Sequence, residues 1–138
     1  MKPFFSLYRF CSSVNINNKV VLNKSIHSKM IMGFISVPNI DEAKKHAAEL
    51  VSADLVACAK LLPGLTSFYK WEGKVNEEQE VYIIVKSMKE KVTDIEAYLK
   101  KNHSYEVHEF IYSEVQSASK DYYNWVVENL LKNKNQDI

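Results

Sequence analysis

The sequence predicts an α+β fold, an antiparallel sheet covered by helices, and three observations support this prediction. Apolar, β-branched runs typical of strands alternate along the chain with amphipathic runs typical of helices. Two of the strand patterns, 66–74 and 81–85, are separated by only a few polar residues, which predicts a long antiparallel hairpin. A helical pattern lies on each side of this hairpin. The resulting order of elements is that of the ferredoxin-like split βαβ sandwich.

The first strand and helix are predicted in the segment 30–54. Its beginning is apolar up to Pro38, as expected of a buried strand. Asn39 is expected to cap the following helix, and Glu42 completes a capping box. His46 is expected to pack at the edge of the apolar stripe rather than to bind a ligand. The residues of that stripe are Ala43, Ala47, Leu50 and Val51.

The hairpin is predicted from the pattern that follows. An apolar run at 55–62 meets a kink or turn at 63–64, where proline and glycine are adjacent. Aromatic residues then alternate with polar ones over 66–74. The polar stretch 76–79 is expected to form the turn, and 81–85 is apolar enough for a central strand buried on both faces.

The last three elements complete the predicted domain. Ser87 and Glu90 form a second capping box, before an amphipathic helix that should end near Asn102. Residues 107–115 are expected to form a further strand, and Ser119 opens the final helix. The sequence therefore predicts one folded domain over 30–133 and a polar tail over 134–138.

Charge is distributed unevenly along the 138 residues. Five of the 18 basic residues and none of the 17 acidic residues lie in 1–29, so the rest carries 13 basic against 17 acidic groups. The net negative charge of residues 30–138 argues against nucleic-acid binding, because it provides no electrostatic field that would attract phosphates. No apolar stretch approaches the ~20 residues that a transmembrane helix needs, so no such segment is expected.

The basic extension 1–29 is acid-free and carries several serines, which is typical of an organelle transit peptide and predicts a mitochondrial location. A disordered tail without targeting function is the alternative. Met30 or Met32 offers an internal start for a cytoplasmic form. With only two cysteines, a reducing compartment is the simpler expectation.

Common enzyme signatures are missing, and no nucleophile–base pair is visible, so a non-enzymatic role is predicted. Cys58 lies among small apolar residues, where a cysteine serves either as a buried hydrophobe or as a soft metal ligand. His103 and His108 flank Tyr105 and Glu106. On a strand their side chains would point to opposite faces, so they form no ready chelate.

The end of the aromatic strand suggests a ligand pocket. Glu72 and Lys74 follow two large aromatic residues, and charged groups held by rigid rings can bind a small polar molecule. An ordinary hairpin tip with a salt bridge is the alternative.

The segment 55–59 and the string Leu-Pro-Gly-Leu-Thr-Ser-Phe-Tyr-Lys-Trp-Glu-Gly-Lys at 62–74 resemble the CutA family, the divalent-cation-tolerance proteins. Asp41-Glu42-Ala43, the segment 103–106 and Asp121-Tyr122 with Trp125 extend the resemblance over about 31–131. The resemblance implies a ferredoxin-like fold, a homotrimer and binding of copper or another divalent metal ion. It implies Cys58 and His103 as metal ligands, although Ser104 stands where the family usually has proline.

Two further functions stay open. One is a trimeric signalling module similar to the PII proteins, which binds a small effector in clefts between subunits. The residues expected to line that cleft are Tyr69, Trp71, Glu72, Lys74, Tyr105, Glu106 and His108. The other is a trimeric scaffold for a membrane partner.

Overall fold

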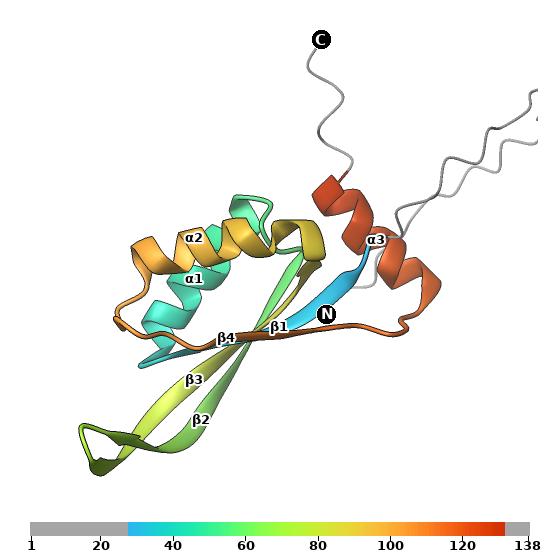
Figure 1. Cartoon of the computed structure of the whole chain (residues 1–138). Helices are drawn as coiled ribbons and strands as arrows, with labels where there is room; N and C mark the ends of the chain where they lie inside the picture. Colours follow the sequence, from blue (N-terminus) through green and yellow to red (C-terminus); the bar gives the residue numbers. More distant parts are fainter. Residues whose placement is uncertain (1–27, 132–138) are drawn as a thin grey trace, which may run out of the picture.

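The computed structural model of the chain describes residues 28–131. The predicted transit segment, except for its last two residues, and the polar tail lie outside them. Four strands form one antiparallel sheet in the order β2-β3-β1-β4, and helices follow β1, β3 and β4. The α+β, ferredoxin-like architecture predicted from the sequence is confirmed (Figure 1). The elements are β1 (Met30–Val37), α1 (Ile40–Ser52), β2 (Cys58–Trp71), β3 (Lys74–Met88), the 3-10 helix η1 (Lys89–Lys91), α2 (Val92–Asn102), β4 (Phe110–Glu114) and α3 (Lys120–Leu131).

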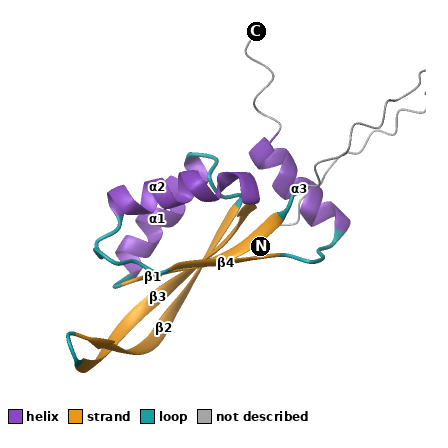
Figure 2. Ribbon diagram, viewed as in Figure 1, coloured by secondary structure: helices purple, strands orange, loops and turns teal. Residues whose placement is uncertain are grey.

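Helices α1 and α2 lie side by side over the sheet, and the β2–β3 hairpin extends well beyond them (Figure 2). Alternate residues of the strands point toward these two helices, as the two-residue period of a strand requires. A second cluster joins α3 to the end of the sheet, through Met30, Met88, Val126 and Leu130. The main core consists of Ile35, Val37, Ala43, Leu50, Val56, Val81, Ile83, Val85, Ile95 and Leu99.

The start of α1 follows the sequence prediction closely. The Asn39 side chain accepts a hydrogen bond of 2.9 Å from the backbone N–H of Glu42. This bond satisfies one of the amide groups that the first turn of a helix leaves unpaired. His46, on the same helix, is fully buried.

The hairpin turn lies at a different place from the predicted one. Trp71 pairs with Lys74, and the two residues between them, Glu72 and Gly73, both have positive φ, at 48° and 77°. Two successive left-handed residues make a tight two-residue turn whose twist matches that of the strands. The stretch 76–79 belongs to β3 and is polar because this arm is exposed. The proline–glycine pair at 63–64 produces the expected kink, a register shift inside β2.

The structure corrects two predictions about β3. Val81, Ile83 and Val85 are buried, but Tyr82 and Ile84 are half-exposed, so the strand is covered on one face within this chain. Ser87 is not a helix cap. It is the penultimate residue of β3, and its hydroxyl donates a 2.6 Å hydrogen bond to the carbonyl oxygen of Leu55, while α2 begins five residues later.

The strand predicted over 107–115 is shorter than expected. Pairing with β1 begins only at Phe110, opposite Ile35, and ends at Glu114. Residues 103–109 therefore form a loop, which is free to turn its side chains in directions that a strand forbids. Among residues 28–131, no helix has both the length and the apolar character needed to cross a membrane.

Candidate functional site

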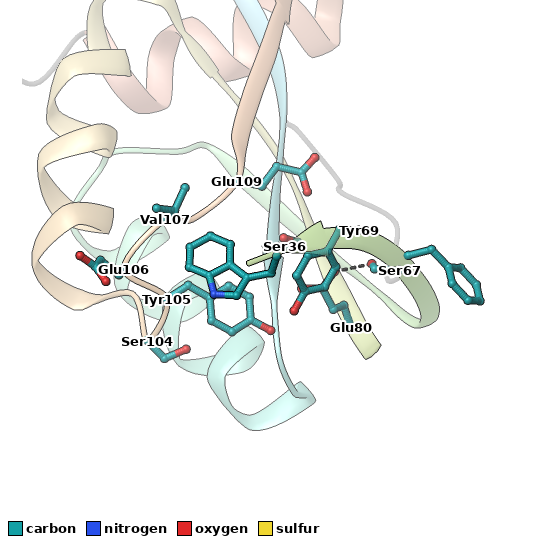
Figure 3. A pocket seen from close by; sticks show the side chains of 11 residues that line it. Ser36, Ser67, Tyr69, Glu80, Ser104, Tyr105, Glu106, Val107 and Glu109 are labelled. Atoms are coloured by element: carbon teal, nitrogen blue, oxygen red, sulfur yellow. Dashed lines mark hydrogen bonds between the residues drawn. The ribbon is translucent and has the colours of Figure 1, made fainter. Parts of the chain in front are cut away.

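A cavity of about 620 Å³ lies where the hairpin arm faces the loop after α2 (Figure 3). Its volume is in the range of small-molecule sites. The wall combines aromatic rings with hydroxyl and carboxylate groups. It is formed by Phe68, Tyr69, Trp71 and Tyr105, by Ser36, Ser67 and Ser104, by Glu80, Glu106 and Glu109, and by Val107. We call this space the hairpin cavity.

Hydrogen bonds hold two of the three carboxylates of the hairpin cavity in place. The Ser67 hydroxyl donates to Glu80 (Figure 3), and the Tyr105 hydroxyl does the same. Tyr82 donates to Glu109 at 3.2 Å. Burial raises the pKa of Tyr105, and the negative charge of Glu80 raises it further. Burial likewise raises the pKa of Tyr82, and the nearby negative charge of Glu109 raises it further. Three glutamates and no Lys, Arg or His line the wall, so its formal charge is negative.

His103 anchors the loop that forms one wall. Its Nε2 donates to the carbonyl oxygen of Ser36 at 2.8 Å, and its Nδ1 accepts from the backbone N–H of Tyr105 at 2.9 Å. This pair of bonds requires the neutral ring with the proton on Nε2. Burial lowers the pKa of His103, although Glu42, 4.0 Å from Nδ1, opposes that shift.

Three histidine rings stack in a row, and two of them belong to this loop. The ring centroids of His46 and His103 are 5.7 Å apart, and those of His103 and His108 are 5.1 Å apart. The expectation that His103 and His108 point to opposite faces is wrong, because their segment is a loop and not a strand. His46 faces Tyr98 through Nδ1 at 2.8 Å and Glu42 through Nε2 at 3.2 Å, so it is a packed core residue as predicted.

Cys58 lies at the other end of the sheet. It is the first residue of β2, it is half-buried, and its side chain shares a hydrogen bond with Tyr122 of α3. Burial and the neighbouring thiol raise the pKa of Tyr122 to about 12. Cys58 pairs with Lys86, which pairs with Met32.

The two predicted metal ligands are therefore far apart within one chain. Cys58 stands at the level of Met32, whereas His103 bonds Ser36, four residues further along β1. Four residues of strand span roughly 13 Å. In the part of the chain that the structure describes, no group of three or more His, Cys, Asp or Glu side chains is arranged to hold a metal ion.

Comparison with known proteins assigns the chain to a family. The model of the family described as "CutA1 divalent ion tolerance protein" matches residues 31–129. The chain belongs to this family. It is 35% identical over 109 residues to a divalent-cation tolerance protein CutA of Yersinia pestis (strain Pestoides F), covering 79% of this chain and 92% of that protein.

Solved structures of CutA1 proteins share the fold. The crystal structure of CutA1 from Oryza sativa aligns with a TM-score of 0.73 at 30% identity and covers 75% of this chain and 95% of its own. The divalent cation tolerance protein from Thermus thermophilus aligns with a TM-score of 0.71 at 33% identity, covering 72% of this chain and 97% of its own. The family description names tolerance of divalent ions rather than a reaction.

Four of the seven predicted cleft residues line the hairpin cavity of this CutA1 chain. They are Tyr69, Trp71, Tyr105 and Glu106. Glu72 and Lys74 are not among its lining residues, because Glu72 is in the exposed turn and Lys74 begins the returning strand. His108 is also absent from the wall and stacks on His103 instead.

Sequence reasoning missed several residues of the wall, among them Ser36, Glu80 and Glu109. Glu80 was detectable. With the turn at 72–73, Ser67 pairs with Glu78, which makes Glu80 its diagonal neighbour on the same face. No pattern in the sequence places Ser36 or Glu109 beside the hairpin, since each comes from an element that only the tertiary fold brings there.

Proposed function

We propose that this protein contributes to tolerance of divalent cations as a homotrimer that binds copper or another divalent metal ion. The observation that carries the proposal is membership of the CutA1 divalent ion tolerance family over nearly all of the described residues. Two features of the structure support the details of the proposal. An uncovered apolar surface supports the trimer, and a half-buried thiol supports copper binding.

The trimer is supported by apolar side chains that the single chain leaves in water. Leu62, Phe68 and Val75 of the hairpin are 47%, 67% and 73% exposed, and Ile111 of the edge strand β4 is 56% exposed. Long strand edges and apolar arms of this kind promote aggregation unless another chain covers them. Closed association of identical chains is the economical way to bury them.

Copper binding is assigned to Cys58 and His103. A thiolate and an imidazole together favour copper or zinc over magnesium or calcium, which prefer oxygen ligands. Since the two side chains lie at opposite ends of the sheet, one ion reaches both only across a subunit boundary. His103 must also give up its bond to the Tyr105 N–H to free a lone pair, which lowers the net affinity.

A metal selectivity experiment tests this proposal. The purified chain is titrated by calorimetry with Cu²⁺, Zn²⁺, Mg²⁺ and Ca²⁺ near neutral pH. Preferential binding of Cu²⁺ and Zn²⁺ is expected, with affinity that falls at acidic pH, because each ligand binds only when deprotonated. Burial lowers the pKa of His103, so this fall should lie below the ordinary histidine value of 6.5. Equal affinity for all four ions, or no binding, would contradict the assignment.

A second candidate function is supported by the hairpin cavity. A trimeric signalling module that binds a small effector, similar to the PII proteins, needs a cavity of ligand size with polar and aromatic walls, and this chain has one. A thermal-shift screen of small metabolites tests this candidate, because a ligand that binds only the folded state raises Tm. The scaffold for a membrane partner has no comparable observation in its favour.

We propose a mitochondrial location from the composition of residues 1–29 alone. A fusion of this segment to a fluorescent reporter tests it. Accumulation in mitochondria is expected, and a diffuse cytosolic signal would favour the alternative start at Met30 or Met32.

A further inference from the structure

We propose that the hairpin cavity is a binding site for a small organic cation, a protonated amine or a quaternary ammonium group attached to an apolar body. This inference rests on the second candidate function, ligand binding in the cavity, and does not depend on metal binding. It is drawn from the charges on the wall, the aromatic rings and the size of the cavity.

The charge of the wall has one sign. Of its eleven residues, three are glutamates and none is Lys, Arg or His. Glu80 is held by hydroxyl donors from Ser67 and Tyr105, so its position is fixed before a ligand arrives. An anionic ligand would meet repulsion with no compensating cation, whereas a cation gains a charge-assisted contact with a preorganised carboxylate.

The aromatic rings also favour a cationic ligand. Trp71, Tyr69, Phe68 and Tyr105 line the cavity together with the glutamates. The negative face of an aromatic ring attracts an ammonium group within about 6 Å of its centre, and tryptophan does so most strongly. The rings also supply the apolar surface that the body of an organic molecule needs.

A bare metal ion fits this wall poorly. The cavity, at about 620 Å³, is far larger than one ion, and the carboxylates do not converge as a metal site within the described residues. A molecule with a cationic head and an apolar body uses both the glutamates and the rings, so it is the better match for the observed wall.

Ser36 adds a polar group to the wall. The residue lines the cavity although it is only 5% exposed. Its carbonyl oxygen accepts from His103, which fixes this part of β1 beside the cavity. A serine hydroxyl in the wall can donate a hydrogen bond to a bound molecule or accept one from it.

The test measures binding of matched probes that differ in charge. Calorimetry on the full chain compares 2-phenylethylammonium and benzyltrimethylammonium with neutral 2-phenylethanol and anionic phenylacetate. We expect both cations to bind at least about tenfold more tightly than the alcohol, and phenylacetate not to bind. Binding of the alcohol or of phenylacetate as tight as that of the cations would overturn the inference but leave ligand binding in the cavity intact. Absence of binding by every probe would overturn the inference as well.

Three variants assign the binding to the cavity. Glu80→Gln keeps an oxygen for its hydroxyl donors but removes the charge, and should weaken cation binding roughly tenfold. Trp71→Leu keeps an apolar side chain but removes the ring, and should weaken binding of benzyltrimethylammonium more than binding of the alcohol. Glu96→Gln, on the exposed face of α2, is the matched control and should change nothing.

Folding of each variant is checked by circular dichroism. If Glu80→Gln does not fold, Glu106→Gln, at an exposed position on the same wall, provides the same readout. Unchanged cation binding in the folded glutamate variant would contradict the inference.

Discussion

His103 donates a hydrogen bond from Nε2 to the backbone carbonyl oxygen of Ser36 at 2.8 Å, which ties the loop after α2 to the end of β1. Ser36 and the loop residue Tyr105 both line the hairpin cavity. The second ring nitrogen of His103 accepts from the Tyr105 N–H. One neutral imidazole thus fixes the backbone on two sides of the cavity. Because Nδ1 accepts a hydrogen bond only in the neutral ring, protonation of His103 would break its bond to the Tyr105 N–H.

The first prediction is that stability falls as the pH drops below 6.5. Burial lowers the pKa of His103 from its ordinary value of 6.5, and the neighbouring His108 and His46 add to this, while Glu42 and the Ser36 carbonyl oppose it. The unfolded chain therefore takes up a proton at higher pH than the folded chain does. This contribution to stability is complete above pH 6.5 and is lost as the pH falls toward the folded pKa, by at most about 1.4 kcal/mol per pH unit.

Urea denaturation of the wild type and of His103→Gln at pH values above and below this range measures the effect. The glutamine can still donate to Ser36 but does not titrate, so the slope should become flatter. His108→Gln is the matched control. An identical slope in wild type and His103→Gln would show that another group is responsible.

The second prediction concerns the close approach of strands at Gly33. A Cβ at this position would lie 3.0 Å from a ring carbon of Phe110, 3.2 Å from the carbonyl oxygen of Ile111 and 3.2 Å from a methyl group of Val85. The ring can shift, but the backbone oxygen of β4 cannot. Gly33→Ala should therefore lower the free energy of unfolding by about 1–3 kcal/mol in urea denaturation. The exposed strand variant Lys60→Ala should stay near wild type, and a Gly33→Ala protein as stable as wild type would refute the close packing of β1 against β4.

The third prediction is that Ser28 and Lys29 belong to the folded unit, although the sequence places them in the extension. Tyr123 donates to the carbonyl oxygen of Ser28 at 2.6 Å, and the Lys89 N–H donates to that of Lys29 at 2.8 Å. A chain that begins at Met30 should be less stable than one that begins at Ser28 by roughly 1–3 kcal/mol, because it loses both bonds.

Thermal unfolding of the two truncated chains measures the difference. Lys29→Ala is the control, since it keeps the backbone bonds and removes only the exposed ion pair with Glu114, so it should change stability little. Equal Tm values for the chains that begin at Ser28 and at Met30 would show that these contacts contribute nothing.

The fourth prediction is that the chain sediments as a trimer at micromolar concentration. An obligate interface buries about 2,000 Å² or more, and a charge placed inside it is costly. Val75→Glu, on the exposed hairpin arm, should shift the protein toward smaller species or aggregates. Glu96→Lys, at an exposed position of α2 away from the hairpin arm, is the control. A folded, monodisperse wild-type monomer would contradict the homotrimer.

The sequence predicted the fold well where one periodicity dominates. The strand 30–37 and the Asn39 cap were correct to the residue, because an apolar run ends at proline and a capping box follows. The hairpin turn was misplaced because the exposed arm of β3 is as polar as a turn. The decisive signal was the glycine at 73, which permits the left-handed pair with Glu72.

The site was less predictable, for a physical reason. Tyr69 and Trp71 were identified as cleft residues because aromatic residues cluster in one strand. Ser36 and Glu109 lie far from them in sequence, and only the pairing of β1 with β3 and the path of the loop after α2 bring them together. The free rotation of a loop also explains why His103 and His108 stack, which no strand period could indicate.

The proposal that this protein binds a soft divalent ion through Cys58 and His103 is tested most directly by a copper titration of wild type and of the double variant Cys58→Ala, His103→Ala. The two single variants and His108→Ala serve as controls, and circular dichroism confirms folding. We predict that the double variant loses at least about tenfold in copper affinity while His108→Ala does not. Equal copper affinity for wild type and the double variant would contradict the proposal.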